Sequence, residues 1–466
     1  MPQPEKIKLY AYNVYFGDCF LLVFEYPENE KKTVLIDFGS TGKGKPEHGA
    51  VIDESDETNK DSTGARLLKV AEHIRDTCGP GGLDVVVATH RHKDHIYGFG
   101  LKDAGKIILD CKPKIVIQPW TEDPEDDRDL AKKKLTADGE EFKAAPRKHF
   151  AAMLGDMHTV AAAIEREAKK LADESKFSKT IDTKLKERIV FAADDNKVKN
   201  KSAVDNLHAM GSAPGSKSHY VHFGYEDIDW DAILPGVRVR ILGPPRLEDS
   251  GDITSATNTS SEFWSLQAMN QYFWGMQAAT SGPPAAGDED DRPLFGREYI
   301  MTATRPPNVR WIVRQLRTVR ASQLLEIVKF VDSALNNTSV IMLFETGDQK
   351  LLFPGDAQIE NWQYALKKPE IKALLKETTL YKVGHHGSRN ATPKSLWESF
   401  VKKSEEADKS GRLRTVISTM KGKHGETPDT AVPLPKMVDA MKKESAYTST
   451  EDIKNDIVIV VEIPIG

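Results

Sequence analysis

The stretch that decides the fold class is Leu83-Asp84-Val85-Val86-Val87-Ala88-Thr89-His90-Arg91-His92-Lys93-Asp94-His95. Its first half is apolar and rich in β-branched residues, which predicts a buried strand. Its second half offers three imidazoles and one carboxylate within six residues, a set that is costly to bury without a cation. Because α/β folds place their chemistry at strand ends, the stretch predicts an α/β protein with a metal site and indicates a hydrolase.

Further apolar or alternating runs predict the rest of the sheet framework. Strands are expected at residues 8–14, 20–24, 32–37, 114–119, 237–242, 339–344, 351–353, 380–383, 415–418 and 457–463. A helix is expected at 65–76, where apolar residues recur at helical spacing, and another at 308–335. Strands therefore gather toward both ends of the chain.

The middle of the chain has a different composition. From residue 121 to about 201 it is rich in Lys, Glu, Asp and Ala and poor in β-branched residues, which favours helices. We therefore expect a mainly helical insertion at 121–234, which could serve as a platform for a substrate or a protein partner. The sheet domain would consist of residues 1–120 and 235–466.

Bulk properties narrow the class of protein. The 466 residues can bury a large core, and no apolar stretch approaches bilayer length. Residues 1–6 do not resemble a signal peptide, and three cysteines are too few for a disulfide framework, so a cytoplasmic location with no membrane association is expected. With a net charge of −5, any nucleic-acid partner must be met by a local basic patch.

Two motifs far downstream add to the metal-ligand set. Asp356 follows an expected strand and Gly355, and His385 and His386 follow another strand in Val383-Gly384-His385-His386-Gly387-Ser388. In an extended segment, His90 and His92 point the same way and could share one cation. Asp94 and His95, past the bend, could address a second cation, and Asp356 is the best candidate for a bridging carboxylate.

In this order, an HxHxDH element, a Gly-Asp pair and a late histidine, the motifs resemble the metallo-β-lactamase superfamily. Within it, the chain is similar to the hydrolase domain of ComEC/Rec2-type competence proteins. The resemblance covers residues 6–120 and 235–465 and rests on six segments: 14–18, 35–39, 90–95, 336–340, 352–356 and 385–388. It implies an α/β fold of four layers, an αββα sandwich with the helical insertion added. The competence proteins are also membrane channels, and this chain has no membrane part, so DNA uptake is not implied.

The resemblance also implies roles for individual residues. His90 and His92 would hold the first metal, Asp94 and His95 the second, and Asp356 would bridge them, with His385 or His386 completing the second site. Asp37 resembles the structural aspartate beside the site. Asp18 is expected to be a turn residue near it.

Two elements of the family pattern are incomplete. The family often supplies a third histidine to the first metal; here His219, His222 or a water are the alternatives, and the histidines could equally be ordinary surface or core residues. The late Gly-His-Pro element is matched only loosely around His424, which would reach the substrate or merely cap a loop.

The expected reaction is hydrolysis by a hydroxide that bridges two divalent cations, zinc in the first place and manganese in the second. Asp94, His386 and His424 are the candidate catalytic residues. A phosphodiester, and hence nuclease or phosphodiesterase activity on nucleic acid or another phosphodiester, is favoured by the resemblance and by arginines at helical spacing. The candidate substrate contacts are Lys382, Ser388, Lys423, Arg310, Arg314 and Arg317, with Arg320 on the same stripe.

Other interpretations of these features stand beside this one. The arginine stripe could be a solvated helix face that pairs with the acidic loop at 288–291. The substrate could be a small carbon ester, lactone or β-lactam, which a deep apolar pocket over the metals would favour. The chain could also be a regulatory member of the fold without turnover.

Overall fold

The computed structural model of the chain describes residues 2–43, 53–60, 62–124, 200–246, 335–424, 431–453 and 456–466. All of them fall in one compact unit, which comprises Met1–Lys132, Asn200–Thr254 and Ser333–Gly466. The helices expected within residues 125–199, all but the last residue of the helix expected at 308–335, the acidic loop at 288–291 and the arginine stripe lie outside the described residues.

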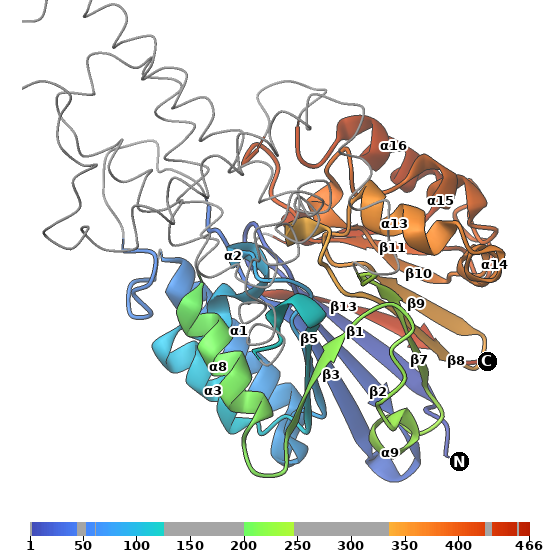
Figure 1. The fold of residues 1–466 in the computed structure, drawn as a ribbon. Helices are drawn as coiled ribbons and strands as arrows, with labels where there is room; N and C mark the ends of the chain where they lie inside the picture. The colour runs from blue at the N-terminus through green and yellow to red at the C-terminus, as the bar shows by residue number, and fades with distance from the viewer. Residues whose placement is uncertain are drawn as a thin grey trace, which may run out of the picture. The chain divides into compact units, whose positions relative to one another are not determined.

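Two sheets of mixed direction form the centre of this unit (Figure 1). The first sheet has seven described strands, in the order β13 (Val458–Pro464), β1 (Lys6–Tyr12), β2 (Cys19–Glu25), β3 (Lys31–Phe38), β4 (Val85–Val87), β5 (Ile115–Pro119) and β6 (Lys217–Val221). The strands from β13 to β3 pair antiparallel, and those from β3 to β6 pair parallel. The parallel half carries the metal-ligand stretch.

The second sheet repeats this division between parallel and antiparallel strands. Its six described strands are, in order, β12 (Ala446–Ser449), β11 (Arg414–Ile417), β10 (Leu380–Lys382), β9 (Gln349–Phe353), β8 (Ile341–Thr346) and β7 (Arg238–Gly243). The strands from β12 to β9 are parallel, and β9, β8 and β7 pair antiparallel. The predicted mixed α/β class is confirmed.

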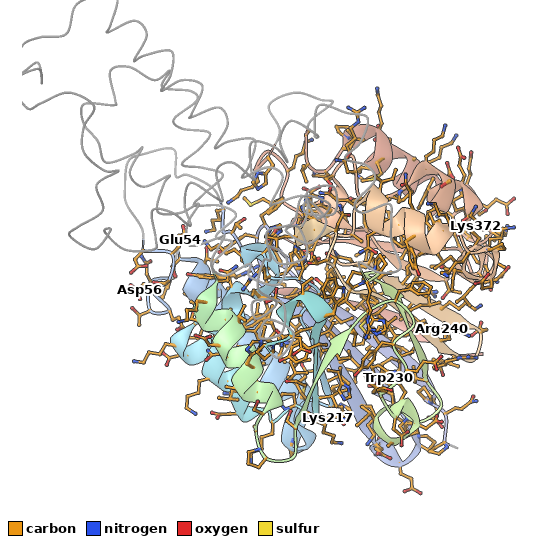
Figure 2. The ribbon with its side chains drawn as sticks, in the orientation of Figure 1. Glu54, Asp56, Lys217, Trp230, Arg240 and Lys372 are labelled. Atoms are coloured by element: carbon orange, nitrogen blue, oxygen red, sulfur yellow. The ribbon has the colours of Figure 1, made fainter. Side chains whose placement is uncertain are left out.

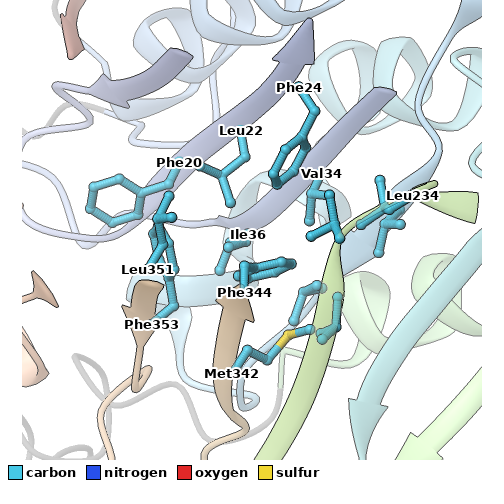
Figure 3. Close-up of a cluster of buried hydrophobic side chains, with 14 of the residues drawn as sticks. Phe20, Leu22, Phe24, Val34, Ile36, Leu234, Met342, Phe344, Leu351 and Phe353 are labelled. Carbon is cyan, nitrogen blue, oxygen red and sulfur yellow. The ribbon is translucent and has the colours of Figure 1, made fainter. Parts of the chain in front are cut away.

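The inner faces of the two sheets share one apolar core (Figure 3). Phe20 and Phe24 of β2 meet Phe353 and Phe344 of the second sheet, with ring centroids 6.1 and 6.3 Å apart. These rings are at most 1% exposed. Because each strand alternates its side chains between faces, the other face of each sheet must be covered separately.

Helices cover both outer faces. On the first sheet lie α1 (Thr63–Cys78), α3 (Lys102–Asp110) and α8 (Lys201–Gly211), which share a second apolar cluster with β2, β3, β4 and β5. On the second sheet lie α13 (Ile359–Leu366), α14 (Pro369–Lys376), α15 (Lys394–Ser399) and α16 (Pro435–Glu444), centred on the fully buried Trp362. Short α2 (Lys93–Ile96) and α9 (Trp230–Ile233) complete the described helices.

Polar side chains occupy the rim of this sandwich. Figure 2 shows Glu54 and Asp56 on the loop before α1, and Lys217 and Lys372 on β6 and α14. Lys217 and Lys372 are exposed. No helix among the described residues combines the length and the apolar composition needed to cross a bilayer.

The insertion expected at 121–234 differs from the structure at its C-terminal end. Residues 201–211 form α8, which packs on the first sheet, and residues 217–221 form β6, which pairs with β5. This segment therefore belongs to the sheet domain. Residues 125–199 lie outside the described residues, so the helical character expected for them stays a prediction.

Candidate metal centre

The ends of parallel strands bring the expected ligands together. Asp37 lies near the end of β3, and the segment from Thr89 to His95 follows β4. In the second sheet, Asp356 follows β9 and the His385–His386 pair follows β10. Since parallel strands end at the same edge of a sheet, residues from distant parts of the sequence converge there.

Four of these residues form a compact group that we call the cluster: Asp94, His95, Asp356 and His386. Each offers one ligand atom, and these atoms all lie within 4.8 Å of one another. His95 Nε2 is 3.1 Å from Asp356 Oδ2, and His386 Nε2 is 3.0 Å from Asp94 Oδ2 and 3.6 Å from Asp356 Oδ2.

The spacing of the cluster atoms fits a divalent cation. Bonds of about 2.0 Å to a tetrahedral ion place its ligand atoms about 3.3 Å apart. His95 Nε2 and Asp356 Oδ2 are close to this separation, yet they are not aligned as a hydrogen bond, and both atoms are buried. Imidazole and carboxylate groups are the nitrogen and oxygen ligands that zinc accepts, so the cluster could hold a metal ion.

A buried carboxylate orients His95. Asp37 Oδ2 lies 2.7 Å from His95 Nδ1, and Asp37 accepts hydrogen bonds from the backbone N–H and the hydroxyl of Thr89, at 2.7 and 2.8 Å. An N–H at Nδ1 leaves the lone pair of Nε2 directed at the cluster. This carboxylate–histidine pairing is the arrangement that commonly fixes metal-ligating imidazoles.

A backbone carbonyl orients His386 in the same way. Its Nδ1 donates to the carbonyl oxygen of Ser418, at 3.0 Å, which leaves Nε2 directed at Asp94 and Asp356. The ring of Phe16 packs against it with centroids 4.4 Å apart. His385 and His386 both have positive φ angles, 42° and 50°. Residues other than glycine rarely adopt this backbone conformation, and where they do it is often at a functional site.

Two glycines permit the close backbone approach that the cluster needs. A Cβ at Gly39 would lie 2.3 Å from the backbone nitrogen of His95, so only glycine lets the end of β3 pack on α2. Gly355 has φ of +57°, and a Cβ there would lie 2.8 Å from Cβ of Thr89. Gly355 thus allows the backbone next to Asp356 to pack closely on Thr89, just after β4.

His90 and His92 lie beside the cluster but are arranged differently. His90 Nε2 is 3.0 Å from His92 Nδ1, and the ring of His90 is 4.1 Å from that of His95. Among the described residues, the groups of three or more converging metal-ligand atoms do not include either of them. They could provide two nitrogen ligands to a neighbouring ion.

The cluster and the His90–His92 pair differ in how their surroundings shift the pKa of their histidines. Burial lowers the pKa of His95, but Asp356, Asp37 and Asp94 outweigh it and raise that pKa well above its usual value. Burial raises the pKa of Asp356, but His95 and His386 outweigh it and lower that pKa well below its usual value. By contrast, burial lowers the pKa of His92 to about 4. The cluster attracts positive charge, and a divalent cation could replace the protons on its imidazoles.

Lys382 and Asp18 form a buried ion pair behind the cluster. Their side chains are 2% and 1% exposed, and the Lys382 ammonium is paired with an Asp18 carboxylate oxygen. This placement differs from the expected contact between Lys382 and a substrate, because β10 ends with the lysine pointing inward. Asp18 is likewise an internal charge partner and not simply a turn residue.

The other expected site residues are more dispersed. His385 Nε2 is 3.8 Å from Asp356 Oδ2, outside the cluster, while its backbone N–H donates to Asp356 Oδ1 at 3.0 Å. The His424 ring also packs against Phe16, with centroids 4.4 Å apart, and burial lowers the pKa of His424 to about 4. Lys423 Nζ donates to the carbonyls of Thr41 and Gly42.

Three further expectations concern residues away from this convergence. Ser388 Oγ is buried and has no hydrogen-bond partner in the described part of the chain. His219 Nδ1 contacts the Tyr225 hydroxyl at 3.1 Å, and His222 Nδ1 contacts its neighbour's carbonyl, that of Phe223, at 2.8 Å. Arg310, Arg314, Arg317 and Arg320 lie outside the described residues.

Sequence reasoning missed several residues that shape the centre. Thr89 connects β4 to Asp37, and Phe16 packs against both His386 and His424. Arg91, between the two histidines of the first motif, is 3.5 Å from Glu122 in a second buried ion pair. All three residues lie in or next to the motifs named above. Their roles depend on the directions of their side chains, which the spacing of residues in the sequence does not determine.

No family model matches the sequence, and a search of the curated proteins finds no match either.

Proposed function

We propose that the chain is a metal-dependent hydrolase with the metallo-β-lactamase fold and that its substrate is a phosphodiester. The observation that carries this proposal is the convergence of Asp94, His95, Asp356 and His386, with ligand atoms within 4.8 Å of one another. The two packed sheets with helices on their outer faces agree with the four-layer arrangement that the sequence resemblance implies.

Two divalent cations are the proposed cofactors. Zinc is the preferred identity for both, and manganese is the alternative. When bound, they would lower the pKa of water and stabilise the negative charge that develops on the attacked group. The cluster would hold one cation, and His90 and His92 would hold the other, with Asp356 shared between them. Asp37 and the Ser418 carbonyl would keep the two cluster imidazoles in the ligating orientation.

Asp94 is the cluster carboxylate best placed to act on a substrate. Its side chain is 16% exposed, whereas that of Asp356 is 1% exposed. Asp94 therefore faces the open side of the centre, where its carboxylate could orient the attacking water and accept its proton. His424 packs against the same Phe16 ring as His386 and, with its pKa near 4, would be neutral at pH 7 and could hydrogen-bond the substrate.

The choice of a phosphodiester rests on the resemblance and on the arginines at 310, 314 and 317 in the sequence. Nucleic acid is the leading candidate within this class, since spaced arginines can neutralise successive phosphates. A protein partner bound through residues 125–199 is also part of the proposal.

The experiment that tests this function uses the full chain, stripped of metal by a chelator and reloaded with Zn²⁺ or Mn²⁺. Hydrolysis of bis(p-nitrophenyl) phosphate and of single- and double-stranded DNA and RNA would be measured. We expect metal-dependent turnover that falls by more than about 100-fold in the His92→Ala, Asp94→Ala double variant, because both cations lose a ligand. His73→Ala is the matched control, since His73 lies on α1 and contacts the Tyr12 hydroxyl.

Two results would contradict the proposal. Undiminished turnover in the double variant would place the activity elsewhere. Absence of phosphodiester hydrolysis by the metal-loaded wild type would reject the substrate class, and a parallel panel of esters, lactones and β-lactams would then separate a carbon-substrate hydrolase from a regulatory protein without turnover.

A further inference from the structure

The Lys382–Asp18 pair is an unusual element so close to a cation site. Lys382 places a buried positive charge 3.8 Å from Asp356 Oδ1. Its ammonium also donates to the Gly355 carbonyl at 3.3 Å and lies 5.8 Å from the ring centroid of Phe20. A buried ammonium is costly unless it is paired, and Asp18 supplies the pairing charge.

The pair also distinguishes the two oxygens of Asp356. Oδ1 accepts the backbone N–H of His385 at 3.0 Å and faces Lys382. Oδ2 has neither contact and faces His95 and His386, at 3.1 and 3.6 Å. One oxygen is therefore held by the protein, and the other is directed at the cluster.

Asp18 is connected to the same imidazoles from behind. Its carboxylate oxygens lie 3.4 Å from His386 Nδ1 and 3.8 Å from His95 Nδ1. Lys382 and Asp18 thus contact three of the four cluster residues without belonging to the cluster. Their charges act on any cation held there.

The total charge of the centre shows what Lys382 adds. Asp94, Asp356, Asp37 and Asp18 contribute four negative charges, and Lys382 contributes one positive charge, if the imidazoles are neutral as metal ligands must be. With two divalent cations the centre carries one positive charge, and it is neutral once a hydroxide is bound between them. Without Lys382 the net charge would be one unit lower in either case, and the attraction of the centre for an anionic substrate would fall.

We propose that Lys382, held in place by Asp18, is a built-in counter-charge that directs Asp356 Oδ2 at the metal ions, weakens their binding and makes the loaded centre one charge unit more positive toward an anionic substrate. This inference rests on the proposed function. Lys382 acts through Asp356 and the metal ions, so it is a positioning residue and not a substrate ligand.

The proposal has a signature that structural damage does not produce. Removing a buried positive charge near a cation site strengthens the attraction for the cation and weakens that for an anion. Loss of packing or of geometry would weaken both. Metal affinity and substrate affinity are therefore expected to move in opposite directions.

The test compares Lys382→Met, Asp18→Asn and the double variant with the wild-type full chain. Mn²⁺ affinity is measured by titration calorimetry on metal-stripped protein, and KM is measured with bis(p-nitrophenyl) phosphate. We expect Lys382→Met to lower the Kd for Mn²⁺ at least about tenfold and to raise KM at least about tenfold, because a unit charge acts through a poorly screened interior. Asp18→Asn should raise the Kd for Mn²⁺, and the double variant should lie near the wild type.

One control variant and one further comparison complete the design. Lys114→Met removes a lysine that is 2.7 Å from Asp84 at the opposite end of β4, and it should change neither quantity. If Lys382→Met leaves Asp18 unpaired and fails to fold, the same charge removal is measured in the Asp18→Asn background, where no buried carboxylate is left alone. There, Mn²⁺ should again bind about tenfold more tightly than it does to Asp18→Asn alone.

The outcomes separate the inference from the proposed function. A wild type that binds no Mn²⁺ or Zn²⁺ would overturn the metal centre itself. A wild type that binds metal, with folded Lys382 variants that bind it equally or more weakly, would overturn the counter-charge and leave the hydrolase proposal standing.

Discussion

The cluster and the His90–His92 pair are neighbours in the centre, but they are built from different charges. The cluster joins two carboxylates to two imidazoles, and both imidazoles are oriented by further hydrogen bonds. In the pair, two imidazole nitrogens lie 3.0 Å apart, and burial lowers the pKa of both rings. The HxHxDH motif assigns two ligands to each of two cations, whereas the geometry makes the two groups of ligands unequal.

The inequality has a thermodynamic consequence. A divalent cation in the cluster gains from two adjacent carboxylates, of which that of Asp356 is fully buried, while a cation at the pair gains mainly from neutral nitrogen ligands. We therefore expect the cluster to bind its metal first and more tightly. Substitutions of the ligands should abolish this difference in metal affinity or increase it.

The largest effect is expected for Asp356→Ala, which removes the carboxylate proposed to serve both cations. Bound zinc per chain should fall from two ions to fewer than one, and phosphodiester turnover should fall more than about 100-fold. Metal content is checked by mass spectrometry after dialysis. Asp348→Ala is the matched control, because Asp348 is an exposed carboxylate in the turn between β8 and β9. It accepts a hydrogen bond from the backbone N–H of Gly466. Two zinc ions retained in Asp356→Ala would contradict the shared-ligand role.

The next effect separates the two halves directly. His92→Ala should retain one tightly bound zinc, because the cluster stays complete, whereas His386→Ala should lose the tighter of two binding steps. Zinc titration against a chelating dye resolves the two steps. If His92→Ala lost the tight step and His386→Ala kept it, the order of affinities proposed here would be reversed.

A smaller effect is expected for Asp37→Asn. The amide keeps the size of the side chain but loses the charge that faces His95 Nδ1, so zinc affinity of the tight step should fall by about 10–100-fold. Zinc affinity of the weak step, at His90 and His92, should change less, since the hydrogen bonds of the Asp37 carboxylate in the described part of the chain are to Thr89 and His95. Thr89→Ser, which keeps the hydroxyl that donates to Asp37, should preserve both steps. Equal loss in both steps would argue for general unfolding.

Much of the framework could be predicted from the sequence because its strands are apolar runs. Strand β4, with Val85, Val86 and Val87 all buried, leads directly into the metal-ligand motif, and β9 leads into Asp356. Strands β6 and β12 were missed. Neither is an apolar run, since β6 reads Lys-Ser-His-Tyr-Val and β12 reads Ala-Tyr-Thr-Ser. The other two edge strands, β7 and β13, are rich in Val, Ile or Leu and were predicted.

The candidate site was predictable in composition but not in orientation. The motifs named all four cluster residues, yet sequence alone does not rank His385 and His386. In the structure the Ser418 carbonyl directs the His386 ring at the cluster, whereas His385 Nε2 lies 3.8 Å from Asp356 Oδ2. Lys382 was expected to face a substrate because it ends a strand beside the motif. Its inward direction depends on Asp18, which lies near the other end of the sequence and carries no signal of this pairing.

The most direct test of the account is the position of bound metal in crystals grown with zinc, located by anomalous scattering at the zinc edge. The account predicts the stronger peak within about 2.2 Å of ligand atoms from Asp94, His95, Asp356 and His386, and a weaker peak at His90 and His92. A crystal with zinc elsewhere and none in the cluster would contradict it.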